Sequence, residues 1–401
     1  MARIKSFRCL NPSCDEQFSM PFFEGCPRCK EKGINSNLYL TYELDIRPPH
    51  EIKANWKSSK GKGIWRFSDR LPDIAPENRI TLEEGNTPLI PLKSLGKELG
   101  LKSLWIKDES RNPTWSWKDR MMSLAVSRAL EAGAKIIAGS STGNAGASLA
   151  AYASRAGLKS YIFACPPLFP AMKTMMQIYG AHLFIVPSRI DRFKIMEQGV
   201  RNRGWYPVTN FTEPPVGSNC FGLEGYKTLS YEIAEQLEFE LPDFVVIPTS
   251  IGDGLCGIYR GFWELKELKL TSRIPKLVAV RPLHEKTVAI SLGRPQESLQ
   301  VRVALEESKG ITCYIEEEDI ILFKKELASK EGIFLEASSV VGICALKKIK
   351  LLLNSKVVVI GTSSGLKDYE IMSEHLNPPY FIGPKLEELD RVLASIQKIS
   401  E

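Results

Sequence analysis

The chain has no long apolar run. Among its 401 residues, no hydrophobic stretch approaches the roughly 20 residues that a membrane-spanning helix needs. The first residues, Met1–Ser6, include Arg3 and Lys5 and lack the apolar core of a secretion signal. We therefore expect a cytoplasmic protein without contact with a membrane.

A strong excess of one charge is also missing. Lys and Arg number 53 and Asp and Glu 47, so the net charge is only +6. There is no basic block or basic–aromatic stripe, so nucleic acid is a poor candidate partner. Gly-x-Ser-x-Gly and Walker motifs are absent as well, which leaves serine hydrolase and P-loop functions without support. The length is too great for one small core and suits two domains plus an appendage.

Cysteine is concentrated at the N-terminus. Four of the nine cysteines form the pairs Cys9-x4-Cys14 and Cys26-x2-Cys29. Two such pairs can supply four thiolates to a tetrahedral zinc ion, and a metal would stabilise a segment too short to bury a core. Two disulfides, which the cytosol disfavours, and a ribbon without metal are the alternatives. Because four sulfur ligands leave no open coordination position, we assign this metal no catalytic role.

One lysine stands in an unusual setting. Lys118 follows a short apolar strand at 104–107 and a polar loop, and it begins a stretch with helical spacing of apolar residues. The first turn of a helix carries positive partial charge and Arg120 adds a second cation, so both should lower the pKa of the amine. A lowered pKa is what a Schiff-base lysine needs near neutral pH. A solvated lysine is the alternative, but Trp115 and Trp117 are unusual in a solvated loop.

The run from Asn112 to Arg120 resembles the N-P-T-G-S-F-K-D-R motif of threonine synthases, pyridoxal-phosphate enzymes of the tryptophan-synthase-β fold (fold type II). Four more segments resemble family motifs and follow in the family's order, so the resemblance covers most of the chain. It implies that Lys118 carries pyridoxal phosphate, that the substrate is a small amino acid and that the protein is a homodimer. The four segments are Glu84–Leu89, Ser141–Asn144, Glu224–Thr228 and Gly361–Asp368.

Several Val- and Ile-rich runs predict strands that are buried on both faces, as in a mainly parallel sheet. With the resemblance, they predict an α/β fold with two open, twisted, mainly parallel-sheet domains and an N-terminal zinc-ribbon-like segment. The segment would cover residues 1–45, the large cofactor-binding domain 46–117 and 217–401, and the small domain 118–216. The predicted strands are 135–139, 160–164, 243–248, 276–280 and 356–361.

Three polar motifs directly follow predicted strands, and ligands bind at the carboxyl ends of strands in such sheets. The first precedes a helix predicted at 145–156, where an ordinary N-cap would have the same residue types. The resemblance implies that Asn144 contacts the 3′-oxygen of the cofactor and that its loop binds the substrate carboxylate. The loop residues are Ser141, Thr142, Gly143 and Ala145.

The second motif is rich in glycine and precedes a helix predicted to begin near Leu255. Glycines let backbone N–H groups converge on an anion, although Gly-x-Gly turns are common without a ligand. The resemblance implies that this backbone binds the cofactor phosphate, and that Thr362, after the last strand, bonds the pyridine nitrogen. An ordinary Ser/Thr turn is the alternative for Thr362. The glycine-rich residues are Gly252, Asp253, Gly254 and Leu255.

The chain departs from the family motifs where the substrate would lie. Ala145 stands where the family has threonine and Gly222 where it has arginine, and the latter loss weakens phosphate recognition. Arg111 could compensate. The nearest specific reaction is therefore O-phosphohomoserine to threonine and phosphate, by β/γ-elimination and replacement. Replacement or ammonia-lyase chemistry on another amino acid is one alternative, and a binding or regulatory protein without catalysis is another.

Histidine is scarce, and none lies in a motif. The four histidines are therefore not expected to exchange protons with the substrate, which leaves that role to Lys118 once its amine is free. They are His50, His182, His284 and His375.

Overall fold

The computed structural model describes residues 3–43, 45, 47–293, 298–349 and 353–400. Contacts divide the chain into two compact units, Met1–Asp368 and Tyr369–Glu401. The second unit consists of helices α13 (Tyr369–Ser373) and α14 (Leu386–Ser400) and the segment between them. No helix in the described part of the chain is long and apolar enough to cross a membrane. All functional residues predicted above belong to the first unit.

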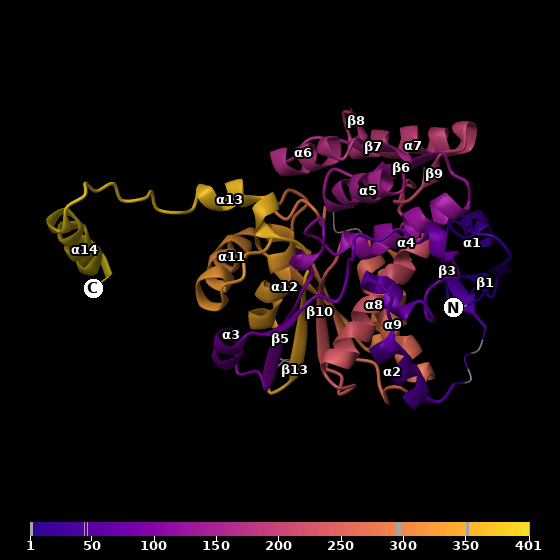
Figure 1. Cartoon of the computed structure of the whole chain (residues 1–401), viewed down its shortest axis with the longest axis horizontal. Coiled ribbons are helices and arrows are strands. Elements are labelled where there is room, and N and C mark those ends of the chain that lie inside the picture. The colour runs from indigo at the N-terminus through magenta and orange to yellow at the C-terminus, as the bar shows by residue number, and fades with distance from the viewer. Residues whose placement is uncertain (1–2, 44, 46, 294–297, 350–352, 401) are drawn as a thin grey trace. The chain divides into compact units, whose positions relative to one another are not determined.

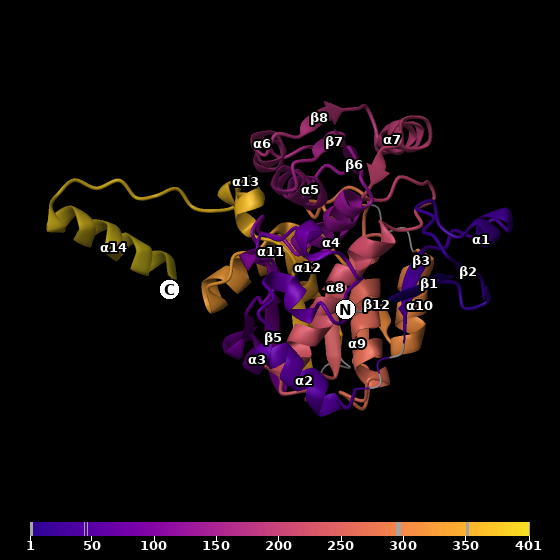
Figure 2. The same cartoon turned by 45° about the vertical axis from the view of Figure 1, so that its right-hand side comes forward.

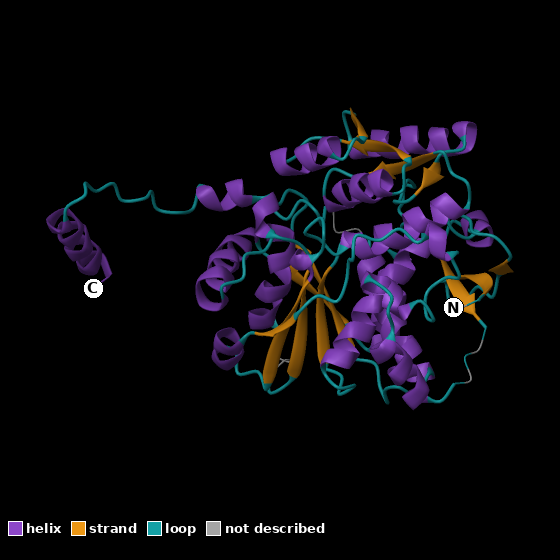
Figure 3. Ribbon diagram, viewed as in Figure 1, coloured by secondary structure: helices purple, strands orange, loops and turns teal. Residues whose placement is uncertain are grey.

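The larger sheet of the first unit has six strands in the order β12-β11-β10-β13-β5-β4. All neighbours pair in parallel except β4, which runs antiparallel to β5 at one edge. The central strands are apolar because helices cover both faces, as Figure 3 shows. The strands are β4 (Leu89–Pro91), β5 (Ser103–Asp108), β10 (Phe244–Pro248), β11 (Lys276–Pro282), β12 (Ile311–Ile315) and β13 (Lys356–Gly361).

Helices pack on both faces of this sheet. Figure 1 shows α8 and α9 on one side and α11 and α12 on the other. Their bounds, with those of three shorter neighbours, are α2 (Pro49–Ser58), α3 (Lys93–Glu98), α8 (Cys220–Gln236), α9 (Asp253–Glu267), α10 (Leu299–Ser308), α11 (Glu317–Glu331) and α12 (Ala337–Lys348).

The smaller sheet has four parallel strands in the order β8-β7-β6-β9. Figure 2 shows it with α5, α6 and α7 around it. All its strands fall within the predicted small domain, and all strands of the larger sheet fall within the predicted large domain, whose boundaries stay a prediction. Its elements are β6 (Ile136–Ser140), α5 (Asn144–Arg155), β7 (Lys159–Ala164), α6 (Pro170–Ile178), β8 (His182–Ile185), α7 (Arg189–Arg203) and β9 (Tyr206–Pro207).

Helix α4 (Lys118–Glu131) connects the two sheets. It packs against α5 of the smaller sheet and against α8 of the larger one. Met122, Tyr152 and Val245, from α4, α5 and β10, belong to one cluster of buried apolar side chains. Burial of each such side chain stabilises the fold by about 1.5–3 kcal/mol, so this shared core fixes α4 between the sheets. The N-terminal end of α4 is thereby held where both sheets present strand ends.

The N-terminal segment forms a small antiparallel sheet of its own, in the order β2-β1-β3. It rests on α8, where the rings of Phe7 and Phe221 lie 5.5 Å apart. The Tyr42 hydroxyl donates to Glu224 Oε2 at 2.5 Å and strengthens the same contact. The elements are β1 (Ile4–Cys9), β2 (Gln17–Phe18), α1 (Pro27–Glu31) and β3 (Leu38–Tyr42).

The fold class expected from the sequence is confirmed. All five predicted strands of the body are present, with ends that move by one or two residues, and α4 begins at Lys118 as predicted. Helix α9 begins at Asp253, two residues before Leu255 and directly after Gly252, which has a left-handed conformation. Gly254 and Leu255 therefore belong to the helix start itself.

Candidate active site

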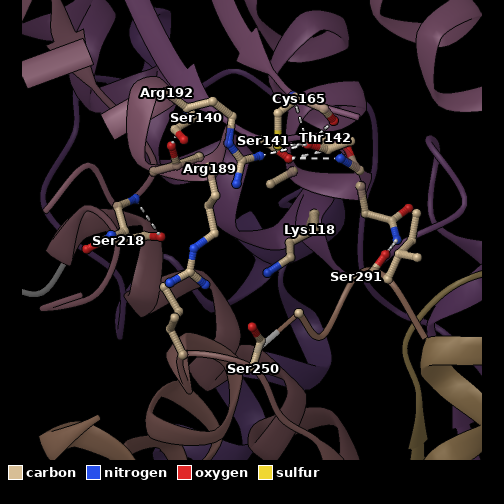
Figure 4. A pocket seen from close by; sticks show the side chains of 18 of the residues that line it. Lys118, Ser140, Ser141, Thr142, Cys165, Arg189, Arg192, Ser218, Ser250 and Ser291 are labelled. Atoms are coloured by element: carbon tan, nitrogen blue, oxygen red, sulfur yellow. Dashed lines mark hydrogen bonds between the residues drawn. The ribbon is translucent and has the colours of Figure 1, made fainter. Parts of the chain in front are cut away.

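Lys118 lies at the border of two adjoining cavities, of about 410 Å³ and about 50 Å³. Lys118, Asn144 and Asp253 line both cavities and come from the first turns of α4, α5 and α9. Figure 4 shows the Lys118 side chain extending into the larger cavity. The structure thus brings together three separate motifs: Asn144 follows Lys118 by 26 residues in the chain, and Asp253 follows Asn144 by 109.

The Lys118 amine is held in apolar surroundings. Its Nζ lies 5.5 Å from the centre of the Trp117 ring and 5.6 Å from that of Tyr226. Burial lowers the pKa of the amine, and the negative charges of Asp253 and Glu336 partly oppose that shift. The pKa is therefore lowered, as expected, and burial is the largest cause. Arg120 contributes no such effect, since Glu109 and Glu232 neutralise its guanidinium at 2.7 Å.

The loop before Lys118 is tied to the end of β13. Trp117 N donates to Thr362 O at 3.0 Å, and Ser363 Oγ donates to Trp115 O at 2.9 Å. Trp115 itself has φ +60°, a left-handed conformation that a residue with a side chain adopts only at a cost. The family motif that this run resembles has glycine here, which adopts such a conformation without that cost. In this chain a tryptophan adopts it and adds an indole ring beside Ser116.

Asn144 is fixed by four hydrogen bonds. Its Nδ2 donates to Glu336 Oε2 at 2.7 Å and to Ser291 Oγ at 3.3 Å. Its Oδ1 accepts from Lys367 Nζ at 2.5 Å and from Ser363 Oγ at 3.1 Å. Burial lowers the pKa of Lys367 to about 8, against the opposing charges of Glu336 and Asp119. Glu336 cannot be identified from the sequence, because a lone glutamate before a helix carries no distinguishing pattern.

The glycine-rich turn at the start of α9 leaves no room for side chains. Gly252 has φ +93°, and a Cβ there would lie 2.2 Å from Val301 Cγ2. A Cβ at Gly254 would lie 2.3 Å from the Trp117 ring. Backbone N–H groups in the first turn of a helix have no partner within that helix, and here they border the smaller cavity. An anion can therefore approach this backbone closely.

Thr362 lies at the carboxyl end of β13 and lines the smaller cavity. Its Oγ1 is 2.6 Å from Ser339 Oγ, and the side chain is buried. A buried hydroxyl that already shares a proton with a neighbour can still donate or accept one further hydrogen bond. All the residues predicted to contact the cofactor are thus found around these two cavities.

The far end of the larger cavity is polar and cationic. Ser141, Thr142, Gly143 and Ala145 all line it, as predicted for the substrate loop. Thr142 Oγ1 accepts from Nη1 of Arg192 at 2.7 Å. The Arg192 side chain is 9% exposed, and its Nε is buried without a hydrogen-bond partner.

A second arginine borders the same end. Figure 4 shows Arg189 and Arg192 directed toward the space beyond the Lys118 amine. They lie three residues apart after Ser188, the N-cap of α7, so they share one face of the helix. Burial, reinforced by the charge of Arg189, lowers the pKa of Arg192. This pair was not identified from the sequence, where only the helix-start spacing could have indicated it.

Two residues singled out from the sequence lie away from the cavities. Arg111 lines neither of them; its side chain is 66% exposed and pairs with Asp108 at 2.9 Å. Gly222 is inside α8, and a Cβ there would lie 2.9 Å from Met121 Cγ. Position 222 therefore serves the close packing of α8 on α4 in this chain.

The four N-terminal cysteines form a compact group. Their sulfur atoms all lie within 4.8 Å of one another, and all four thiols are free. Ser36 Oγ lies 3.2 Å from Cys9 Sγ, and Asn11 Nδ2 donates to Cys29 Sγ at 3.4 Å. Four converging sulfurs with hydrogen-bonding neighbours could hold one metal ion, and this donor set suits structural zinc.

Comparison with known proteins agrees with this geometry. The pyridoxal-phosphate-dependent enzyme family matches residues 80–363. A threonine synthase from Methanocaldococcus jannaschii is 31% identical over 367 residues, which cover 83% of this chain and 88% of that protein. A threonine synthase from Synechocystis is 33% identical over 339 residues, which cover 80% of this chain and 86% of that protein.

Solved structures share the fold at lower identity. A diaminopropionate ammonia lyase from Escherichia coli superposes with a TM-score of 0.63 at 18% identity, covering 75% of this chain and 93% of that one. A maize serine racemase superposes with a TM-score of 0.61 at 19% identity, covering 72% of this chain and 92% of that one. The fold and the site define a pyridoxal-phosphate-dependent elimination or replacement enzyme of fold type II. Within that class, the chain belongs to the threonine synthase family.

Proposed function

We propose that this enzyme converts O-phosphohomoserine and water to threonine and phosphate. The proposal depends on one observation. The Lys118 amine, Arg189 and Arg192 all line the same cavity, of about 410 Å³. A cavity of this kind offers a proton-transferring group at one end and a binding site for a phosphate at the other. The curated relatives named threonine synthase support the same reaction.

The cofactor fits the residues present. Gly252, Asp253, Gly254 and Leu255 would hold its phosphate through backbone N–H groups, since the crowding at both glycines excludes side chains. Lys118 would hold its reactive carbon, Asn144 its 3′-oxygen and Thr362 its pyridine nitrogen. Pyridoxal phosphate supplies an electron sink that makes the substrate's C–H bonds acidic. A neutral hydroxyl at Thr362, unlike a carboxylate, moderates that sink.

The chain's own groups then position the substrate and move protons. The Lys118 amine, whose lowered pKa favours the neutral form, takes the proton from the substrate α-carbon and returns protons along the substrate chain. The loop Ser141–Ala145, at the start of α5, binds the substrate carboxylate through N–H groups. Glu336 and Lys367 hold the Asn144 side chain in place, and a bond from its Nδ2 to the cofactor would replace the long bond to Ser291 Oγ at 3.3 Å.

Arg192 binds the substrate phosphate, and Arg189, whose Nη2 is paired with Glu213 at 3.2 Å, adds positive charge beside it. Arg192 has an unpaired buried Nε, and a phosphate oxygen would satisfy it with a charge-assisted hydrogen bond. Thr142 adds a hydroxyl beside Arg192. These groups take over the role left open by Gly222, and Arg111 is not required for it.

The test is to supply cofactor-loaded enzyme with O-phosphohomoserine and to assay both products. We expect threonine and phosphate to appear in equal amounts. Turnover of serine or an O-substituted serine without turnover of O-phosphohomoserine would instead support the alternative β-replacement or ammonia-lyase reaction. Failure of Lys118 to bind the cofactor, seen as no absorbance change on its addition, would support a non-catalytic binding protein.

We also propose that Cys9, Cys14, Cys26 and Cys29 bind one structural zinc ion, since their sulfurs converge and are already free of disulfides. Metal analysis of protein purified without chelator should give one zinc per chain. The family resemblance further supports a homodimer, which sedimentation analysis would test.

A further inference from the structure

A third cavity, of about 300 Å³, lies where the N-terminal segment meets α9 and α10. It shares no lining residue with either cavity at Lys118. We call it the ribbon pocket and define it by Arg8, Tyr39, Arg260, Trp263, Gln300 and Glu307, which line it. Its size falls at the lower end of the range of small-molecule sites.

The ribbon pocket contains a cation that the fold does not fully neutralise. The Arg260 side chain is 14% exposed, and its Nε is buried without a hydrogen-bond partner. Its Nη2 donates to Leu40 O at 3.1 Å, while the nearest carboxylate, Glu224, is 4.0 Å from Nε. Arg8 adds a second, more exposed cation, whose pairing with Asp15 is long at 3.3 Å. One negative charge on a ligand would therefore be favoured here.

The walls of the pocket suit a flat ring. The Arg260 guanidinium already lies 3.9 Å from the centre of the Tyr39 ring, a cation–π contact that fixes its plane. Trp263, on the next turn of α9, is 40% exposed although it is a large apolar side chain. Glu307 also lines the pocket and disfavours a second negative charge on the ligand. An aromatic ring bearing one carboxylate matches these features.

The pocket is connected to the glycine-rich turn by one buried side chain. Gln300 is 1% exposed, and its Nε2 donates to Ile251 O at 2.7 Å and to Asp253 Oδ1 at 2.9 Å. Asp253 in turn accepts from Ser218 at 2.6 Å, and it begins α9, the helix that carries Arg260. A ligand that contacts Gln300 and Arg260 therefore contacts the side chain that bonds this turn and also the helix that the turn begins.

We propose that the ribbon pocket is a regulatory site for a small aromatic carboxylate, whose binding changes the affinity of the glycine-rich turn for the cofactor phosphate. The binding itself is independent of the reaction proposed above. The change in cofactor affinity rests on that proposal, because it requires the turn to bind pyridoxal phosphate. By thermodynamic reciprocity, the cofactor must then change the affinity for the carboxylate by the same factor.

The test uses the zinc-supplied full chain, with indole-3-acetate as the probe and uncharged indole-3-acetamide as its matched control. Calorimetry should show binding of the acid and at least about tenfold weaker binding of the amide, because the charge-assisted bond to Arg260 is lost. Arg260→Met and Trp263→Ala should each weaken binding of the acid. Arg302→Met, an exposed arginine on α10 outside the pocket, should leave it unchanged.

Three outcomes would overturn the proposal. The acid and the amide could bind equally, or neither could bind at millimolar concentration. Binding could also survive Arg260→Met and Trp263→Ala and disappear in Arg192→Met, which would place the probe in the Lys118 cavity. Because Arg260 also contacts Leu40, Trp263→Ala serves as the variant that preserves folding. Binding at the pocket with an unchanged dissociation constant for pyridoxal phosphate would refute the regulatory part alone, provided that the cofactor still reacts with Lys118.

Discussion

The two ends of the Lys118 cavity differ in how they are built. The cofactor end consists of turns that directly follow β6, β10 and β13, and its residues lie in recognisable motifs. The other end, where we propose that the substrate phosphate binds and which we call the phosphate end, is formed by Arg189 and Arg192, which lie on α7 after the edge strand β8 and belong to no motif. The cofactor end is fixed by backbone geometry, whereas the phosphate end is fixed by two long side chains.

This difference predicts that substitutions at the two ends of the cavity have different effects. Substitution of Gly252 or Gly254 would push a Cβ into Val301 or the Trp117 ring, so the cofactor end tolerates little change. A side chain on the outer helix α7 can be exchanged without moving a strand. We therefore expect variants at the cofactor end to affect every substrate, and variants at Arg192 to affect only phosphorylated ones.

The largest effect is expected for Lys118. Both Lys118→Ala and Lys118→Arg should lower turnover by at least about 10³-fold, because a guanidinium keeps the charge but can neither bind the cofactor carbon nor exchange protons at neutral pH. Absorbance of the lysine-bound cofactor should vanish in both. Lys135→Ala, an exposed lysine outside the cavities, is the control and should behave as the wild type. Residual turnover in Lys118→Arg close to the wild-type rate would assign proton transfer to another group.

Next in size is the effect of Arg192→Met. Loss of a charge-assisted bond to the substrate phosphate should lower kcat/KM for O-phosphohomoserine by about 10- to 100-fold. The dissociation constant of pyridoxal phosphate should be the same in Arg192→Met as in the wild type. Arg111→Met is the control variant, and its kcat/KM for O-phosphohomoserine should equal that of the wild type. If Arg192→Met lost affinity for pyridoxal phosphate by the same factor as kcat/KM, the two ends of the cavity would not have separate roles in binding the cofactor and the substrate phosphate.

A smaller effect is expected at the glycine-rich turn. Gly252→Ala should weaken binding of pyridoxal phosphate by about tenfold, since Val301 must move and the backbone is strained at positive φ. Gly157→Ala is the matched control, because Gly157 also has positive φ but has no atom within 4 Å of an added Cβ. If both variants weaken binding equally, backbone strain and not the crowded turn accounts for the loss.

The smallest effect on catalysis is expected from the cysteine group. Removal of zinc by a chelator, or Cys29→Ser, should lower the melting temperature because the segment loses its main stabilising bonds. Turnover at 25 °C should change less than in any variant above, since none of the four sulfurs lines the Lys118 cavities. Loss of turnover without loss of stability would contradict a purely structural role.

Most of the fold could be predicted because its signals are local. Runs of Val and Ile mark strands that are covered on both faces, and β13 was found at the predicted residues 356–361. Asn144, Gly252 and Thr362 could be predicted as one site because their loops directly follow strands, and parallel strands align their carboxyl ends. Lys118, which follows β5 only after a loop, was joined to them by the resemblance to the family motif. Arg111 was placed in the site on sequence adjacency to Asn112, but its pairing with Asp108 keeps it outside.

The rest depends on contacts between distant segments. Glu336 bonds Asn144 across 192 residues, and Arg192 bonds Thr142 across 50, and no local pattern encodes either pair. Burial is the largest cause of the lowered Lys118 pKa, whereas Arg120 lies beside Lys118 in sequence but is neutralised by Glu109 and Glu232 in the fold. A charged residue next to Lys118 in the sequence therefore need not change its pKa, because ion pairs formed in the fold can cancel that charge.

The sequence by itself determined the class of chemistry. A lysine at a helix start, an asparagine loop, a glycine-rich turn and a threonine after a strand are local features, because backbone geometry at strand ends sets them. Only the tertiary structure decided which charges line the Lys118 cavity, because long side chains from α7 reach it through packing that sequence spacing does not reveal. It also created the ribbon pocket, whose residues come from the N-terminal segment and from α9 and α10, and which exists only where these surfaces meet.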